Sequence, residues 1–200
     1  MTMRVLVHDR SAGRLSRVWA AGSTLYRGLR RIDATHAVDS WDGAFAWLAT
    51  LREPIHELQY WGHGKWGAAL VGDDVLDHAA FGDRRAQLEQ LRDQLAPDAL
   101  IWFRTCETFG AQRGIDFAER LADFLGVRVA GHTHVIHYHQ SGLHGLAPGV
   151  RADWSPDEGL VEGTAHDPRR ARRSAPWLPR TVTCLSGSVP ERWFTTPKRS

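Results

Sequence analysis

The sequence predicts an α/β fold in which a parallel sheet carries helices on both faces. Short apolar runs alternate along the chain with segments of helical periodicity, and this order favours parallel strands joined by crossover helices. The run at 99–103 (ALIWF) is continuously apolar, which is typical of a strand buried on both faces. The chain has 200 residues, of which 42% are hydrophobic, enough for a domain with a substantial core.

The first part of the chain contains the first two predicted strands. A Val-rich run at 3–8 (MRVLVH) predicts the first strand. Apolar residues at 14–30 have roughly helical spacing, but Gly13, Gly22 and Gly28 punctuate this part of the chain, so a loop followed by a helix is expected there. Residues 32–38 predict a weaker strand. Asp39 or Ser40 then caps a helix that ends before Pro54, with Phe45, Leu48 and Leu51 on its apolar face.

The middle of the chain continues the alternation. Residues 55–61 (IHELQYW) predict a strand. Residues 68–77 predict a hairpin with its turn at 72–74, because Asp and Gly suit a tight turn. An amphipathic helix is expected over 83–95, closed by Pro97.

The clearest predicted helix follows the buried strand. It covers 115–125 and is terminated by Gly126. Residues 127–130 predict a short strand and residues 181–185 a last one. The composition therefore predicts an α/β domain over 1–150 and a Pro- and Arg-rich extension over 151–200 that packs on the same domain.

Composition and charge exclude several function classes. The net charge of +2 is too small to indicate a nucleic acid partner, and no run approaches the ~20 apolar residues that a membrane helix needs. Two cysteines are few for an oxidising compartment, and the start of the chain lacks the pattern of a signal peptide. We therefore expect a cytoplasmic protein that binds neither nucleic acid nor membrane; the oligomeric state stays open.

His63 and Cys106 each follow the carboxyl end of a predicted strand. In open parallel sheets, function collects beyond these ends. A thiolate can attack a carbonyl while an imidazole transfers the proton. Gly64 allows the chain to turn and present its N–H to a substrate oxygen. Cys106 lies between a strand and a helix, where a helix N-terminus lowers a thiol pKa.

The segments YWGHGKWG (60–67) and LIWFRTCETFG (100–110) resemble the two active-site motifs of the caspase-like cysteine peptidases, in particular their small bacterial members. The resemblance covers residues 4–145. It implies a three-layer α/β/α sandwich with core strand order 2-1-3-4. It also implies a cysteine endopeptidase with His63 as general base, Cys106 as nucleophile, and an oxyanion hole formed by the N–H groups of Gly64 and Cys106.

The sequence departs from this family in two respects. The residues around the cysteine are RTCETF rather than the QACRG or QACQG of caspases, and no second substrate-binding subunit is visible. A catalytically silent caspase-like module that binds a protein partner is therefore the alternative. In that case His63 is a hydrogen-bonded loop residue and Cys106 a small buried hydrophobe.

Arg104 and Glu107, which flank the cysteine, are the predicted substrate-binding residues. By the resemblance, the residue two positions before the cysteine lines the pocket for the side chain that precedes the cleaved bond. An arginine there favours Asp or Glu, because a guanidinium pairs with a carboxylate through two hydrogen bonds. The alternative is a structural ion pair of Arg104 with Glu107 or Asp9.

A histidine cluster from His132 to His144 offers a different chemistry. His132 and His134, or His137 and His139, alternate along an extended chain and could share a metal. GHTH resembles one motif of the calcineurin-type metallophosphoesterases, but the carboxylate motifs of that family are missing. A metal-dependent hydrolase is thus a minor alternative, and we expect no metal and no cofactor. The basic run from Arg169 to Arg173 predicts a solvated linker.

Overall fold

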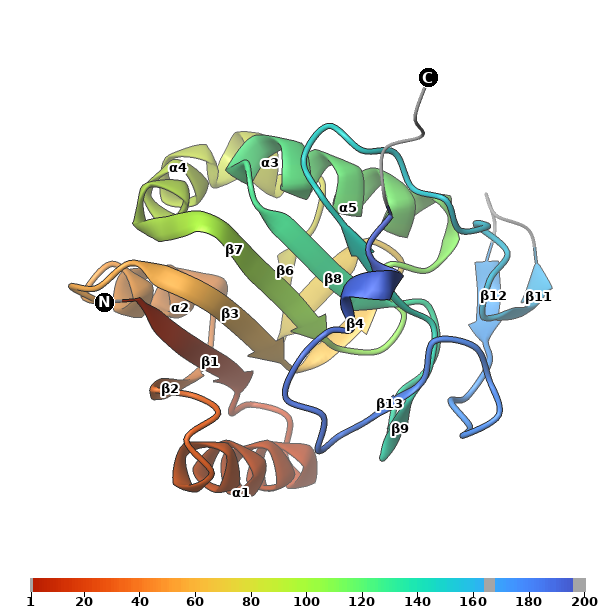
Figure 1. Ribbon diagram of the computed structural model, residues 1–200, viewed down its shortest axis with the longest axis horizontal. Coiled ribbons are helices and arrows are strands. Elements are labelled where there is room, and N and C mark those ends of the chain that lie inside the picture. The colour runs from red at the N-terminus through yellow and green to blue at the C-terminus, as the bar shows by residue number, and fades with distance from the viewer. Residues whose placement is uncertain (1, 164–167, 196–200) are drawn as a thin grey trace.

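A six-stranded sheet forms the centre of the molecule (Figure 1). The computed structural model describes residues 2–163 and 168–195, and for 161–163 and 168–170 only the backbone. The sheet has the order β10-β8-β7-β3-β1-β2. Its strands are β1 (Met3–Asp9), β2 (Ala34–Val38), β3 (Ile55–Trp61), β7 (Leu95–Arg104), β8 (Arg128–His132) and β10 (Leu143–Leu146).

The expected core order 2-1-3-4 is confirmed, since β2, β1, β3 and β7 are successive neighbours. These strands and β8 pair in parallel, whereas β10 pairs antiparallel with β8 at the edge of the sheet. No sequence pattern predicted β10. Its residues LHGL alternate poorly, and the strand depends on pairing with β8 rather than on its own propensity.

One face of the sheet carries the main core. Val5 and Val7 point to this face, where α2 (Trp41–Leu48), α4 (Arg85–Gln94) and α5 (Ala111–Leu125) contribute the apolar side chains that cover it. The stripe of α5 is almost fully buried, as its sequence periodicity predicted. The α-helical pattern at 115–125 therefore marked the helix correctly, although the helix begins four residues earlier.

On the opposite face, a helix covers one part of the sheet and the C-terminal segment covers another part. Leu6 points to this face and packs with Tyr26 of α1 (Arg14–Gly28), together with Ile32 and Trp61. Farther along the sheet, Trp102 and its neighbours are covered by the C-terminal segment, including Val182 and Val189. Figure 1 shows α1 lying apart from α3 (Ala80–Asp83), α4 and α5, and the blue C-terminal segment includes β13 (Val182–Thr183).

Several predicted helix ends are confirmed. Ser40 caps α2 by accepting a hydrogen bond from the N–H of Gly43 at 3.0 Å. Gly126 ends α5 with a φ of 68°, a conformation that favours glycine. The helix expected before Pro97 ends at Gln94, and β7 begins at the next residue.

The glycines of the first helix do not interrupt it, contrary to the expectation of a loop over part of 14–30. α1 is one continuous helix. Gly22 is required by packing, because a Cβ at this position would lie 2.7 Å from a ring atom of Trp61. The glycine thus allows the helix to approach the sheet closely, which sequence periodicity alone could not indicate.

A small antiparallel sheet follows β3. It consists of β4 (His63–Lys65), β5 (Ala68–Val71) and β6 (Asp74–Leu76), in that order. The hairpin expected over 68–77 corresponds to β5 and β6. β4 was not predicted, so His63 lies on a short strand rather than in a loop.

The segment after residue 150 contributes to the same cores. Trp154 belongs to the main core, and β13 (Val182–Thr183) pairs with β9 (His139–Gln140). A second hairpin is formed by β11 (Leu160–Gly163) and β12 (Pro168–Ala171), and η1 (Glu191–Trp193) follows. The Arg169–Arg173 run lies partly in β12; the side chains of its first two residues are outside the described part, and Arg172 and Arg173 are exposed. No helix in the described residues is long and apolar enough to cross a membrane.

Replacing Gly114 of α5 by alanine should destabilise the fold. The added Cβ would lie 2.4 Å from the carbonyl carbon of Phe109, which is backbone and cannot move cheaply. Alanine favours helix by about 1 kcal/mol over glycine, but overpacking costs roughly 1–3 kcal/mol, so we expect a net loss. Gly28→Ala, at the end of α1, meets no atom within 4 Å and is the matched control. Urea denaturation measures both, and a rise in midpoint for Gly114→Ala would contradict this packing.

Candidate functional site

His63 and Cys106 lie at the same edge of the sheet. Trp61 and Arg104, the last residues of β3 and β7, are register partners, and each of the two candidate residues follows two positions later. Gly64 packs directly against the cysteine loop, since a Cβ there would lie 2.8 Å from the carbonyl oxygen of Cys106. The backbone segments that carry His63 and Cys106 are therefore in contact, as the parallel topology predicted.

Backbone hydrogen bonds fix the loop after β7 on two sides. The N–H groups of Trp66 and Gly67 donate to the carbonyls of Glu107 and Thr108, each at 2.9 Å. On the other side, the loop donates to the end of β8 and the residues after it, from Glu107 N–H to the His134 carbonyl at 3.1 Å. Cys106 is thus held on a short loop anchored between β4–β5 and β8.

Both candidate side chains line one cavity of about 640 Å³. His63 is exposed and meets the ring of Trp19 edge to face, with centroids 5.5 Å apart. The cavity walls come from α1, from the ends of β3 and β7, from the chain around β9 and from the C-terminal segment. The lining residues are Leu15, Val18, Trp19, Gly22, Leu25, Tyr26, Trp61, Gly62, His63, Arg104, Cys106, Ile136, His137, Tyr138, Gln140, Cys184 and Leu185.

The Cys106 thiol is largely shielded from water and protonated at rest. Burial raises its pKa, a backbone hydrogen bond from Ile136 opposes this, and the nearby Glu107 charge raises it again. The thiol itself donates to the Ile136 carbonyl at 3.8 Å, which favours its protonated form. The expected lowering by a helix N-terminus is wrong, because α5 begins only at Ala111 and burial has the larger effect. The thiol therefore needs a base to become a nucleophile.

Arg104 is a buried structural clamp. Its side chain is stacked over the Trp102 ring at 4.3 Å, and the residue is only 4% exposed. Its guanidinium donates to the Gln140 side chain, to the Tyr26 hydroxyl at 2.7 Å, and to backbone carbonyls of the C-terminal segment. These carbonyls belong to Thr183, Cys184 and Ser186.

The clamp changes the interpretation of Arg104. A guanidinium has five N–H groups, and every one of its nitrogens already donates to protein acceptors here. No free fork remains for a substrate carboxylate, so the expected pairing with an acidic side chain does not fit this geometry. Neither does the alternative ion pair: among the described residues, no carboxylate of Glu107 or Asp9 contacts Arg104, and Asp9 instead accepts from Ser11.

Glu107 is not among the residues that line the cavity, contrary to its prediction as substrate-binding. The chain turns at this residue with a φ of 52°, and its carbonyl accepts the N–H groups of Trp66 and Gly110. Burial raises the pKa of the Glu107 carboxyl, while Lys65 lowers it. Its role in the structure is to shape the loop that carries Cys106.

The histidines from His132 to His144 are used within the fold. His132 is fully buried, and its Nδ1 lies 3.1 Å from the Ser141 carbonyl. His144 is stacked on Trp154, with its Nε2 2.8 Å from Glu158 and its Nδ1 2.8 Å from Arg180. Because Arg180 can only donate, the His144 ring is neutral with its proton on Nε2. No group of three or more metal-ligating side chains occurs in the described part of the chain.

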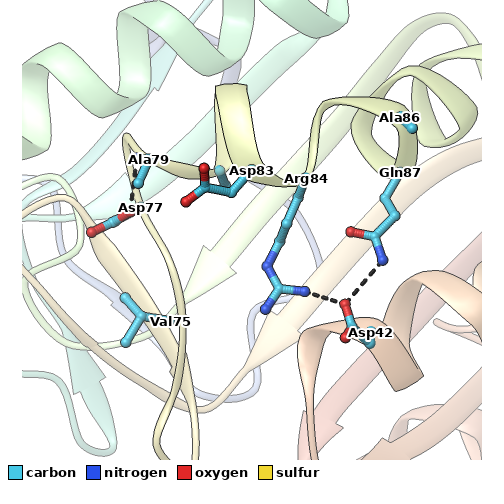
Figure 2. Close-up of a pocket in the computed structure, with 9 residues that line it drawn as sticks. Asp42, Val75, Asp77, Ala79, Asp83, Arg84, Ala86 and Gln87 are labelled. Carbon is cyan, nitrogen blue, oxygen red and sulfur yellow. Dashed lines mark hydrogen bonds and ion pairs between the residues drawn. The ribbon is translucent and has the colours of Figure 1, made fainter.

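A second hollow is lined by Val75 of β6 together with residues of the neighbouring helices and loops (Figure 2). It measures about 650 Å³ and is lined by polar side chains of α2, α3 and α4. Arg84 bridges Asp42 and Asp74, and Gln87 donates to Asp42 at 2.9 Å. Its lining includes neither histidine nor cysteine, so it lacks the nucleophile and base found in the first cavity.

Comparison with known families places the chain in one of them. Residues 23–143 match the family described as a domain of unknown function, DUF4347. The match spans more than half of the chain, and the protein therefore belongs to this family. The matched stretch includes His63 and Cys106. It does not include Cys184 and Leu185, which also line the cavity. No curated protein and no solved structure matches the chain.

Sequence reasoning missed the residues that complete the cavity. Tyr26, Gln140 and the segment at 183–186 assemble around Arg104 from distant parts of the chain. The sequence of α1 did indicate a second apolar surface, because this helix has more apolar residues than one buried face can hold. The sequence predicted a strand at 181–185 but not its contact with Arg104, because the acceptors there are backbone carbonyls.

Substituting Arg104 by methionine should destabilise the protein strongly. The change keeps the chain length but leaves the Tyr26 hydroxyl and the carbonyls of Cys184 and Ser186 without this donor. Losing one partner of a buried charged network costs roughly 3–5 kcal/mol. Arg92→Met, on the exposed surface of α4, should change the free energy of unfolding by less than about 0.5 kcal/mol. Equal midpoints for the two variants in denaturant would show that the clamp is not stabilising.

Acid should destabilise the fold through His132. Burial lowers the pKa of His132 to about 3, so the folded protein keeps this ring neutral while the unfolded chain protonates near pH 6.5. The stabilising contribution is therefore complete above pH 6.5 and decreases between pH 6.5 and about 3, by up to ~1.4 kcal/mol per pH unit. His132→Gln should show a shallower decrease in denaturation midpoint over this range. A parallel decrease in both proteins would exclude His132 as the cause.

Proposed function

We propose that this chain is a cysteine endopeptidase with a caspase-like three-layer fold, acting in the reducing cytoplasm on a protein or peptide substrate. The single observation that carries the proposal is that His63 and Cys106 line the same cavity at the carboxyl edge of the sheet. A nucleophile and a base from neighbouring strands, facing one hollow, are the minimum that acyl transfer requires.

The proposed reaction uses these two residues in sequence. His63 removes the thiol proton, and the Cys106 sulfur attacks the substrate carbonyl carbon. The imidazolium then protonates the leaving amine as the C–N bond breaks, and water hydrolyses the thioester to restore the thiol. The N–H groups of Gly64 and Cys106 would stabilise the oxyanion. Within the described residues, the N–H of Cys106 has no acceptor, which leaves it available for this role.

The second candidate is a catalytically silent caspase-like module. One observation favours it: the contact of the Cys106 sulfur is with the Ile136 carbonyl, and burial raises the thiol pKa. In that case the same cavity binds a partner segment without cleaving it. The two candidates differ in whether His63 ionises the thiol near neutral pH, so the reactivity of Cys106 distinguishes them.

The pH dependence of alkylation tests the dyad directly. Cys184 lines the same cavity, so the measurement uses a Cys184→Ser background with iodoacetamide. If His63 ionises the thiol, labelling of Cys106 should have its inflection below about 8.5, the ordinary thiol pKa. His63→Ala should move the inflection above that value, because burial then acts without a base. His56→Ala, an exposed histidine at the start of β3, is the matched control.

The same variants test peptide hydrolysis. Cys106→Ser should lower kcat/KM by about 10³-fold or more, since nucleophile and base act as one unit. His63→Ala should lower it to a similar extent. An inflection that does not depend on His63, combined with no hydrolysis above background, would support the silent module instead.

A further inference from the structure

The first helix has an apolar stripe that the fold does not cover. Ser23 and Tyr26 face the sheet and are buried. A neighbouring stripe carries Leu15, Val18 and Leu25, which remain 45%, 63% and 47% exposed and line the cavity. Amphipathic helices usually bury their apolar stripe, and clustered exposed apolar residues mark binding surfaces. This stripe lies along the cavity that contains Cys106.

Another part of the lining is apolar as well. It includes Ile136, Tyr138 and Leu185, of which Tyr138 is 55% and Leu185 is 44% exposed. Trp61, His63 and Cys106 line the same cavity. The candidate nucleophile therefore shares its cavity with apolar side chains of α1, of the chain around β9 and of the C-terminal segment. A volume of about 640 Å³ lies within the ~300–1,000 Å³ of typical ligand pockets.

Among the described residues, the cavity lining holds no carboxylate and no guanidinium that is free to pair with a charged side chain. Its lining contains no Asp or Glu that could pair with lysine or arginine. Arg104 is its only guanidinium, and the acceptors of the fold already occupy that group. A lysine or arginine side chain placed here would lose its hydration without gaining a carboxylate partner. An acidic side chain would find only the imidazoles of His63 and His137.

We infer that the uncovered stripe of α1 is the specificity wall of the peptidase, and that the residue preceding the cleaved bond is large and apolar, such as Leu, Met or Phe. This inference rests on the proposed function. The occupant is a peptide segment, because the cavity contains a nucleophile that attacks a carbonyl carbon. The residue whose side chain fills the cavity must present its own carbonyl to that nucleophile. The acidic preference expected from Arg104 is replaced by an apolar one.

Affinity labelling of the full chain in the Cys184→Ser background tests the inference. The probes are Ala-Ala-X chloromethyl ketones with Leu, Phe, Asp or Lys at X. The Cys106 sulfur bonds to the methylene carbon and displaces chloride, while His63 takes the thiol proton. The Leu and Phe probes should label Cys106 at least about tenfold faster than the Asp and Lys probes, the discrimination expected of an apolar pocket.

Two matched variants locate the discrimination on α1. Val18→Asp puts a charge on the stripe at an exposed position and should slow labelling by the Leu probe roughly tenfold. Ala20→Asp puts the same charge on an exposed position of the same helix that does not line the cavity, and should leave the rate unchanged.

Each outcome has one meaning. Faster labelling by the Asp or Lys probe, or equal rates for all four, would overturn the inference and leave the peptidase proposal standing. Labelling that is independent of His63 for every probe would overturn the peptidase proposal, and the inference with it. Equal slowing by Val18→Asp and Ala20→Asp would show that the stripe is not the wall.

Discussion

The buried guanidinium of Arg104 is the interaction on which the site depends. It lies at the end of β7, and it joins three parts of the chain that are far apart in sequence: the sheet, α1 through the Tyr26 hydroxyl, and the C-terminal segment through its carbonyls. Stacking on Trp102 supports the same group from the sheet. Burial lowers the pKa of Arg104, yet the dense set of acceptors keeps a charged group tolerable inside the protein.

The clamp also explains the shape of the cavity. The Tyr26 hydroxyl, which Arg104 contacts, also donates to the carbonyl of Cys184, so that α1 and the C-terminal segment are tied at one end. The exposed stripe of α1 lines the cavity together with Tyr138 and Leu185. A polar network thus ties together the elements that line an apolar cavity containing Cys106. This division separates stability, which comes from the clamp, from recognition, which we assign to the stripe.

The protonation states of the site follow from burial. The pKa of Cys106 is raised, because its thiol is shielded and Glu107 lies next to it, whereas His63 is exposed on β4 beside Trp19. An exposed imidazole can move toward a bound substrate, and a rigid loop holds the sulfur in place. The buried histidines behave differently. His132 and His144 are neutral and hydrogen-bonded, and they connect β8 and β10 to the rest of the structure through Ser141, Glu158 and Arg180.

The sequence by itself determined the parallel strands of the sheet and the edge where the candidate residues lie. Apolar runs such as 99–103 and the periodicity of 115–125 are local patterns, and the parallel orientation of the first four strands follows from them by the rules of chain crossover. Their order 2-1-3-4 was implied by the resemblance to caspase-like peptidases. Only the tertiary structure decided the environment of Arg104, the absence of Glu107 from the cavity wall and the second apolar face of α1. These features depend on residues such as Tyr26, Gln140 and Cys184, which no local pattern connects. A guanidinium can bind a substrate only if its N–H groups are not already used by the protein. For Arg104 this depends on which distant carbonyls the folded chain brings close to it.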